Sequence, residues 1–89
     1  MSVVIRVFGP SPGCAKCTAT EKVARHVAQK YDDVIVEKHD IFSDEAEKYN
    51  IMMSPTVLVN NVTVEVGKVP SAEKLEKAVE NALRIEEVK

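Results

Sequence analysis

The chain alternates segments typical of strands with segments typical of helices, and this alternation limits its possible folds more than any other feature. Residues 3–8, VVIRVF, are β-branched with an aromatic end, as in a strand. Glycines and prolines in residues 9–13 break that pattern, and from Ala15 to about Tyr31 apolar residues recur at helical spacing. Residues 34–39, VIVEKH, indicate a second strand. A strand, a helix and a strand in this order predict a parallel pair joined by a right-handed crossover.

The second half of the chain predicts a short helix, a hairpin and a closing helix. Ser43 and Ser71 are suited to cap the two helices, because each precedes a segment of helical pattern. Residues 60–61, NN, separate the runs TVLV and VTVEV, which predicts a hairpin with positive φ at both asparagines. The order β-α-β-α-β-β-α predicts an α/β fold with a four-stranded mixed sheet and helices on both faces.

Length and charge exclude several classes of protein. Eighty-nine residues leave room for one domain, and we expect residues 1–89 to form it. A net charge of −2 argues against nucleic-acid binding, which typically needs a basic patch. The sequence has neither a signal-peptide pattern nor an apolar run near the roughly 20 residues of a membrane span. We therefore expect a cytoplasmic monomer that binds neither membrane nor cofactor.

Cys14 and Cys17 are the two cysteines of the chain, three positions apart. A Cys-x-x-C pair can be a disulfide staple, half of a metal site or a redox couple. A cytoplasmic setting argues against a structural disulfide. A tetrahedral zinc site needs four ligands, and His26 and His39 are poorly spaced to complete one. We expect no metal site, and ordinary boundary or surface roles for both histidines.

The position of the pair favours redox chemistry. Cys14 lies where the loop passes into the helix, and the unpaired N–H groups of a helix start stabilise a thiolate. We therefore expect a lowered pKa for Cys14 and a nucleophilic role, with added positive charge from Lys16. Cys17 shares the helical phase of Ala24 and Ala28, so it should face inward as the resolving thiol. Cys14 would attack a substrate disulfide, and Cys17 would then attack the mixed disulfide.

Residues 44–59, DEAEKYNIMMSPTVLV, resemble a stretch of the thioredoxin family: a short helix, then an X-Pro-Thr motif that opens a strand. With Cys14-Ala-Lys-Cys17 after the first strand and Gly67 before the last helix, the resemblance extends over nearly the whole chain. The chain looks like a small, glutaredoxin-sized redox protein of the archaeal kind. The resemblance implies a thioredoxin-like fold and a thiol–disulfide oxidoreductase that reduces protein disulfides. A thioredoxin-reductase-like enzyme would recharge it.

The X-Pro-Thr motif supplies the substrate-binding residues that the resemblance implies. In the family this proline is cis and lies beside the cysteine pair. Carried over, Pro55 would be cis, and Ser54 would offer its backbone to an extended substrate segment, with Thr56 completing the motif. A cis X-Pro bond is uncommon and is normally held in place for a reason.

The chain also departs from the family. Thioredoxins carry a buried aspartate where this chain has Phe8, so the proton acceptor for Cys17 is open. Glu21 is one candidate, because residues i and i+4 of a helix are neighbours. Glutaredoxins hold glutathione with a Gly-Gly and acidic signature after the hairpin, where this chain reads VGKVPSAEK at residues 66–74. We therefore expect a thioredoxin-like protein that does not depend on glutathione.

Two other functions stay open. Small copper and mercury carriers also place Cys-x-x-C between a first strand and a first helix. Their order of elements is β-α-β-β-α-β, whereas this chain predicts β-α-β-α-β-β-α. This chain also has Gly13 at the position where such carriers have a threonine or histidine after a methionine. The other alternative is a redox-inactive docking module on the same fold, because a fold does not fix function.

Overall fold

Four strands form one mixed sheet in the computed structural model, which describes residues 3–9 and 15–88, with side chains up to residue 84. The elements are, in chain order, β1 (Val3–Gly9), α1 (Ala15–Ala28), β2 (Val34–Asp40), α2 (Asp44–Lys48), β3 (Thr56–Val59), β4 (Val62–Val66) and α3 (Ala72–Val88). The strand order is β2-β1-β3-β4. β1 pairs with β2 in parallel and with β3 antiparallel, and β3 pairs with β4 antiparallel. The predicted element order and mixed sheet are confirmed.

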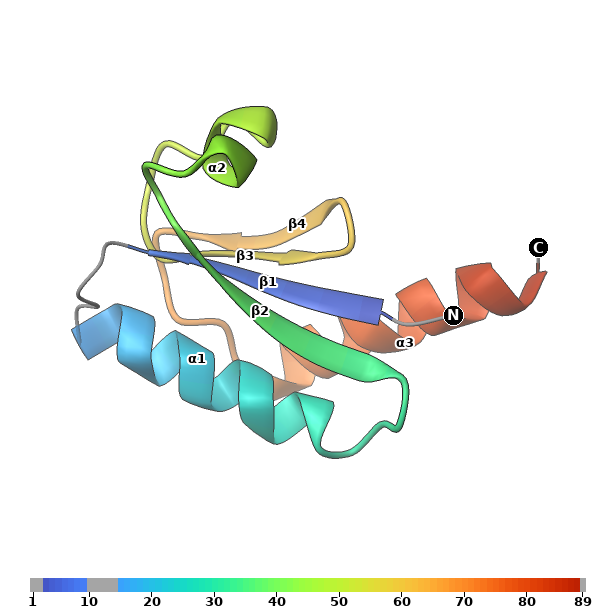
Figure 1. The fold of residues 1–89 in the computed structure, drawn as a ribbon. Coiled ribbons are helices and arrows are strands. Elements are labelled where there is room, and N and C mark those ends of the chain that lie inside the picture. The colour runs from blue at the N-terminus through green and yellow to red at the C-terminus, as the bar shows by residue number, and fades with distance from the viewer. Residues whose placement is uncertain (1–2, 10–14, 89) are drawn as a thin grey trace.

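One face of the sheet is covered by α1 and α3 (Figure 1). Alternate residues of β1 point to this face, because successive side chains of a strand lie on opposite sides. The buried residues of the resulting cluster are Val3, Ile5, Val7, Ala24, Val27, Val34, Val57, Val59, Leu75 and Val79. This cluster is the main core, and it packs α1 and α3 against the sheet.

The opposite face carries α2 (Figure 1). Phe8 of β1 and Leu58 of β3 point to this side and are buried with Ala46 of α2. Ile41 and Ile51, from the segments that enter and leave α2, pack against these three residues. A five-residue helix therefore stays in place through tertiary packing, because so short a helix is unstable alone.

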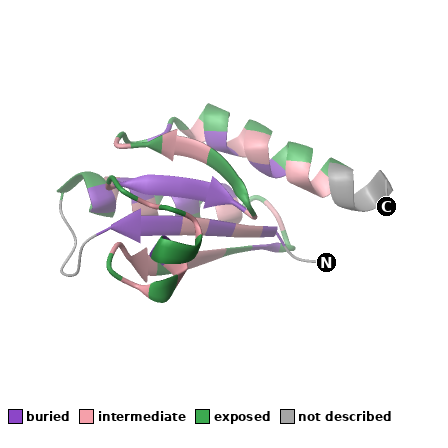
Figure 2. Cartoon of the chain, turned by 90° about the horizontal axis from the view of Figure 1, so that it is seen from above, coloured by how far each residue is buried: buried purple, intermediate pink, exposed green. Residues whose placement is uncertain are grey.

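Burial follows the layers, as Figure 2 shows. All four residues of β3 are buried, as expected for a central strand that is covered on both faces. The edge strand β4 is mostly exposed or half-buried. Within the part of the chain that the structure describes, no helix is both long and apolar enough to cross a membrane.

Both serine caps are confirmed. The hydroxyl of Ser43 accepts a hydrogen bond from the backbone N–H of Ala46, at 3.3 Å. The hydroxyl of Ser71 accepts from the backbone N–H of Lys74, at 3.1 Å. Each bond satisfies one of the N–H groups that a helix start leaves unpaired.

Two local predictions are wrong. The first helix ends at Ala28 rather than near Tyr31, and the backbone N–H groups of Lys30 and Tyr31 bond three residues back in tighter turns. In the hairpin, positive φ occurs at Asn60, at 54°, but not at Asn61. The turn also bonds to β1, since Asn60 donates its N–H to the carbonyl of Val4 at 2.8 Å and accepts the N–H of Val4 on Oδ1 at 3.0 Å.

Candidate redox site

Cys17 lies in the first turn of α1 and is 2% exposed. Its thiol lies against the last residue of β1. A Cβ atom added to Gly9 would stand 2.8 Å from Sγ and 3.2 Å from Cβ of Cys17. The inward orientation predicted for Cys17 is therefore confirmed, and only a residue without a side chain fits opposite it. Cys14, its predicted partner, lies outside the described residues.

The other residues at the start of α1 face solvent. Ala15 and Lys16 are exposed, whereas Cys17 is buried. The backbone carbonyl of Lys16 accepts a hydrogen bond from the hydroxyl of the buried Thr20, at 2.8 Å. The structure thus places the charge of Lys16 on the solvent side of the helix start, away from the buried side chain of Cys17.

The strand register brings distant parts of the chain to the end of the sheet where Cys17 lies. Gly9 is opposite Asp40 of β2, Phe8 is opposite Thr56 of β3, and Thr56 is opposite Val66 of β4. The start of α1, the segment before β3 and the segment after β4 therefore meet at one end of the molecule (Figure 1).

The X-Pro-Thr motif forms part of this end. The Ser54–Pro55 bond is cis, the geometry that the resemblance implies. Pro55 is buried and its carbonyl accepts the N–H of Gly67 at 2.7 Å, which joins the motif to the segment after β4. The hydroxyl of Thr56 donates to the carbonyl of Met53 at 2.6 Å. The side chain of Thr56 therefore fixes the preceding loop, and half-buried Ser54 lies outside the strand ladder, which begins at Thr56.

Gly67 has φ of +74°, a conformation that side-chain-bearing residues rarely adopt. A Cβ at this position would lie 3.0 Å from Cε of Met53. The glycine thus allows the segment after β4 to turn closely against the loop that carries Ser54.

Charged groups on α1 and β2 form a small network one helical turn from Cys17. Glu21 accepts a hydrogen bond from Arg25 at 2.8 Å and lies 3.6 Å from Nζ of Lys38. The hydrogen bond from Arg25, with further help from Lys38, lowers the pKa of the Glu21 carboxyl. A lowered pKa makes this carboxylate a weaker base, so the geometry does not support Glu21 as the proton acceptor for Cys17.

Phe8, at the position where the resemblance implies a buried aspartate, points to the α2 face. It stacks on His39 with ring centroids 5.1 Å apart and meets the edge of Tyr49 at 6.3 Å. Cys17 lies against Gly9, and the β1 side chain on the same face as Gly9, two residues before it, is that of Val7. Neither Phe8 nor Val7 can accept a proton, so β1 supplies no base at either position.

The contact between Gly9 and Cys17 is the feature of the site that the sequence did not reveal. From the sequence, Gly9 is one of the glycines and prolines that break the first strand pattern. Its position directly after an alternating strand gave a signal, since the phase that turns Val7 toward α1 also turns residue 9 toward α1. The distance between Gly9 and Cys17 depends on how α1 packs against the sheet, so it cannot be predicted from the local sequence pattern.

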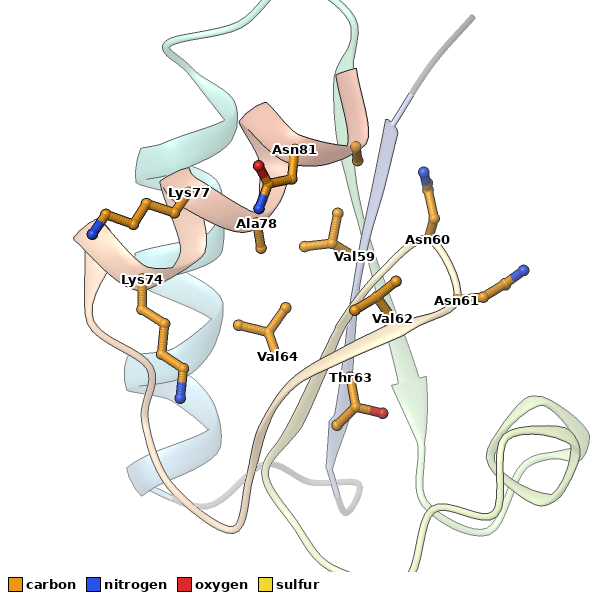
Figure 3. Close-up of a pocket in the computed structure, with 11 residues that line it drawn as sticks. Val59, Asn60, Asn61, Val62, Thr63, Val64, Lys74, Lys77, Ala78 and Asn81 are labelled. Carbon is orange, nitrogen blue, oxygen red and sulfur yellow. The ribbon is translucent and has the colours of Figure 1, made fainter. Parts of the chain in front are cut away.

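The structure also contains a groove of about 610 Å³ between β4 and α3 (Figure 3). Its lining consists of valine, alanine, asparagine, threonine and lysine side chains, among them Val64 and Asn81. It lies beside residues 60–61, at the other end of the hairpin from Thr56 and Val66. Within residues 3–9 and 15–88, no group of three or more His, Cys, Asp or Glu side chains is arranged to hold a metal ion.

Comparison with known proteins agrees with the fold. A family model described as a thioredoxin domain matches residues 3–80. A thioredoxin from Methanocaldococcus jannaschii is 34% identical over 82 residues, which cover 91% of each chain.

Solved thioredoxin structures are also similar. A mutant thioredoxin from Halobacterium salinarum NRC-1 superposes with a TM-score of 0.68 at 25% identity, over 90% of this chain and 74% of that one. A chloroplastic thioredoxin z reaches a TM-score of 0.70 over 93% of this chain and 80% of that one, and at 19% identity it supports the fold alone. The family match spans most of the chain and includes Cys17 and the Ser54–Pro55 bond. The chain therefore belongs to the thioredoxin family, and this membership supports a thiol–disulfide oxidoreductase role.

Proposed function

We propose that this protein reduces disulfide bonds of other proteins, with Cys14 as the nucleophile and Cys17 as the resolving thiol. The observation that supports the proposal most is the placement of Cys17. It is buried in the first turn of α1 against Gly9, at the end of the sheet that carries the Ser54–Pro55 bond. A buried thiol is shielded from the substrate, which suits the resolving step, in which Cys17 attacks the mixed disulfide rather than the substrate.

The exchange has two steps. The thiolate of Cys14 attacks one sulfur of the substrate disulfide, which forms a mixed disulfide and releases the first substrate thiolate. Cys17 then loses its proton and attacks the Cys14 sulfur, which forms the Cys14–Cys17 disulfide and releases the second thiolate. Two electrons pass from the protein to the substrate, and the two protons from the cysteine thiols balance the two substrate thiols.

Two features of the helix start support the nucleophilic role of Cys14. The unpaired N–H groups of the first turn of α1 carry partial positive charge, which stabilises a nearby thiolate. The exposed Lys16 adds a positive charge on the solvent side. An isolated exposed charge contributes about 1 kcal/mol or less, so we expect Lys16 to adjust the pKa of Cys14 rather than to set it.

Substrate segments would add to the backbone at Ser54, which lies outside the sheet ladder, by strand addition. A dithiol reductase of the thioredoxin-reductase type would regenerate the reduced protein in the cytoplasm. Glutathione would be a poor reductant, because recognition of its carboxylates needs several specific partners. Residues 66–70 contain one cation that could bind a carboxylate, the exposed Lys68.

Two cysteine variants test the assignment of roles. We expect Cys14→Ser to abolish reduction of a disulfide-bonded test protein, whereas Cys17→Ser should accumulate a mixed disulfide with it, detected by mass spectrometry. In the reduced wild type, Cys14 should alkylate faster than Cys17. Faster alkylation of Cys17 contradicts the assignment, and stoichiometric tight Cu⁺ binding without disulfide reduction favours the metal carrier instead.

The reductant is tested by regeneration of the oxidised protein. We expect millimolar glutathione to regenerate it far more slowly than a dithiol reductant does. Equal rates with glutathione and with the dithiol would replace the thioredoxin-like function with a glutaredoxin-like one.

A further inference from the structure

Two large apolar side chains stand in solvent beside α2. Phe42 is 87% exposed and Met52 is 89% exposed. Each follows an isoleucine, Ile41 or Ile51, that packs against the buried cluster around Phe8. Because each isoleucine points into this cluster, the residue after it is directed outward. The exposure of Phe42 and Met52 is therefore built into the fold.

The turn that carries Phe42 is fixed by hydrogen bonds on both sides. The N–H of Phe42 donates to Oδ1 of Asp40 at 2.8 Å. The N–H and the hydroxyl of Ser43 both donate to the carbonyl of Asp40, at 3.0 and 2.6 Å. An aromatic side chain on a turn of this kind binds a partner at low entropic cost, since the backbone is already ordered.

The turn that carries Met52 is fixed in a similar way. The N–H of Ile51 donates to the carbonyl of Ala46 at 2.8 Å, and Asn50, two residues after the end of α2, has φ of 56°. A pocket of about 320 Å³ lies between the two turns, and both Phe42 and Met52 line it. Met52 is flexible and polarisable, so it can adapt to apolar side chains of different shape.

This surface is joined to the redox site through the backbone. The N–H of Ile41 donates to the carbonyl of Gly9 at 3.1 Å, and Gly9 is the residue that contacts the thiol of Cys17. On the other side, Met52 stands three residues before Pro55 in the same loop. Met52, which lines the pocket, is therefore two residues from Ser54 along the chain.

The surroundings of the pocket are acidic. Residues 40–52 contain four carboxylates and one lysine, a net charge of −3, while the whole chain has −2. The remainder of the chain is therefore slightly positive, at +1, and the negative charge is concentrated here. Glu47 lines the pocket itself. Charge complementarity at this rim selects a basic partner.

We propose that Phe42, Met52 and the pocket between them, here called the Phe42–Met52 surface, form a docking site for the substrate protein. The occupant is a large apolar side chain of the substrate that lies near its disulfide and is flanked by lysine or arginine. The inference rests on the proposed function, because it names the class of substrate that the redox site prefers.

The test compares substrates that differ only in what the surface recognises. Three disulfide-bridged peptides carry, beside the bridge, a leucine with two lysines, the same leucine with two glutamates, or an alanine with two lysines. Hydroxyethyl disulfide, which is too small to reach the pocket, reports the exchange reaction by itself. The variants are Phe42→Ala with Met52→Ala, and Glu47→Lys. Ile35→Ala is the matched control, since Ile35 is 48% exposed and lies opposite Val4, at the other end of β2 from Asp40.

We expect the wild type to favour the leucine–lysine peptide. The double alanine variant should raise KM for that peptide about tenfold, the effect of losing a strong apolar anchor, with kcat unchanged. Glu47→Lys should reduce or reverse the preference for lysine over glutamate, and this effect should weaken at high salt. The control variant and the rates with hydroxyethyl disulfide should remain within twofold of the wild type.

Equal KM values for the three peptides, or an unchanged KM in the double variant, overturn the docking proposal. So does a dimer that dissociates in the double variant without a change in KM, because the surface would then bind a second copy of the chain. Calorimetry with the leucine–lysine peptide, its cysteines replaced by serine, tests docking without any chemistry. If neither the three peptides nor a disulfide-bonded test protein is reduced, the proposed function fails, and the calorimetric result still decides the docking proposal.

Discussion

Replacement of Gly9 by alanine tests how closely β1 packs against the redox helix. The new methyl group would stand 2.8 Å from Sγ of Cys17 and 3.2 Å from its Cβ. Optimal contacts between such atoms are about 3.5–4.0 Å, so the overlap is roughly 1 Å. Cys17 is 2% exposed and its Cβ is fixed to the backbone of α1. The start of α1 or the end of β1 therefore has to move.

The expected loss of stability combines two effects. Overpacking of a core by one methyl group costs about 1–3 kcal/mol. Alanine also restricts the unfolded chain, which recovers about 0.4–1 kcal/mol, because Gly9 does not adopt the positive φ that alanine avoids. The net loss is on the order of 1–2 kcal/mol. For a domain of this size we expect the melting temperature to fall by roughly 5–15 °C.

The assay is thermal denaturation of the reduced protein, so that no disulfide contributes. Cys17→Ala removes the sulfur that the methyl group overlaps, and in that background we expect Gly9→Ala to cost much less. Gly67→Ala is a useful comparison, because its methyl group meets the mobile end of Met53 and its cost arises from φ of +74°. A melting temperature of Gly9→Ala within 2 °C of the wild type, or equal losses in both backgrounds, would refute the packing argument.

Substitutions at three further residues test other parts of the structure. Phe8→Ala should lower the free energy of unfolding by about 3–5 kcal/mol in chemical denaturation, because it empties the core under α2, and a loss below 1 kcal/mol contradicts that. Glu21→Gln should lower the free energy of unfolding by about 0.5 kcal/mol at neutral pH, because it removes the charged bond with Arg25. That bond lowers the pKa of Glu21 in the folded protein. Its contribution to stability is therefore present above the unfolded pKa near 4.5 and is lost as pH falls through the folded pKa. A difference in unfolding free energy between Glu21→Gln and the wild type that persists at pH 2 argues against this assignment. Asn60→Ala should lower the free energy of unfolding by about 1–3 kcal/mol, because it leaves the N–H of Val4 unpaired and keeps a side chain at φ of 54°. Asn60→Gly also leaves that N–H unpaired, but glycine adopts this φ without strain, so the loss of stability should be smaller.

Features that depend on residues a few positions apart could be predicted from the sequence. The element order follows from apolar spacing, and the caps at Ser43 and Ser71 depend on a hydroxyl and an N–H three residues later. The burial of Cys17 follows from its helical phase with Ala24. In each case the deciding interaction is local, so the residues that make it are already neighbours in the chain.

Features that join distant segments required the tertiary structure. The prediction of positive φ at both hairpin asparagines failed, and Asn60 there bonds to Val4, 56 residues away. The contact of Gly9 with Cys17 depends on how α1 lies against the sheet. Phe42 and Met52 are ten positions apart and line one pocket only because the isoleucine before each packs against the same buried cluster. Periodicity gives the direction of a side chain within its own element, whereas the distance between elements is set by the packing of all of them, and that packing decides which groups meet at the redox end.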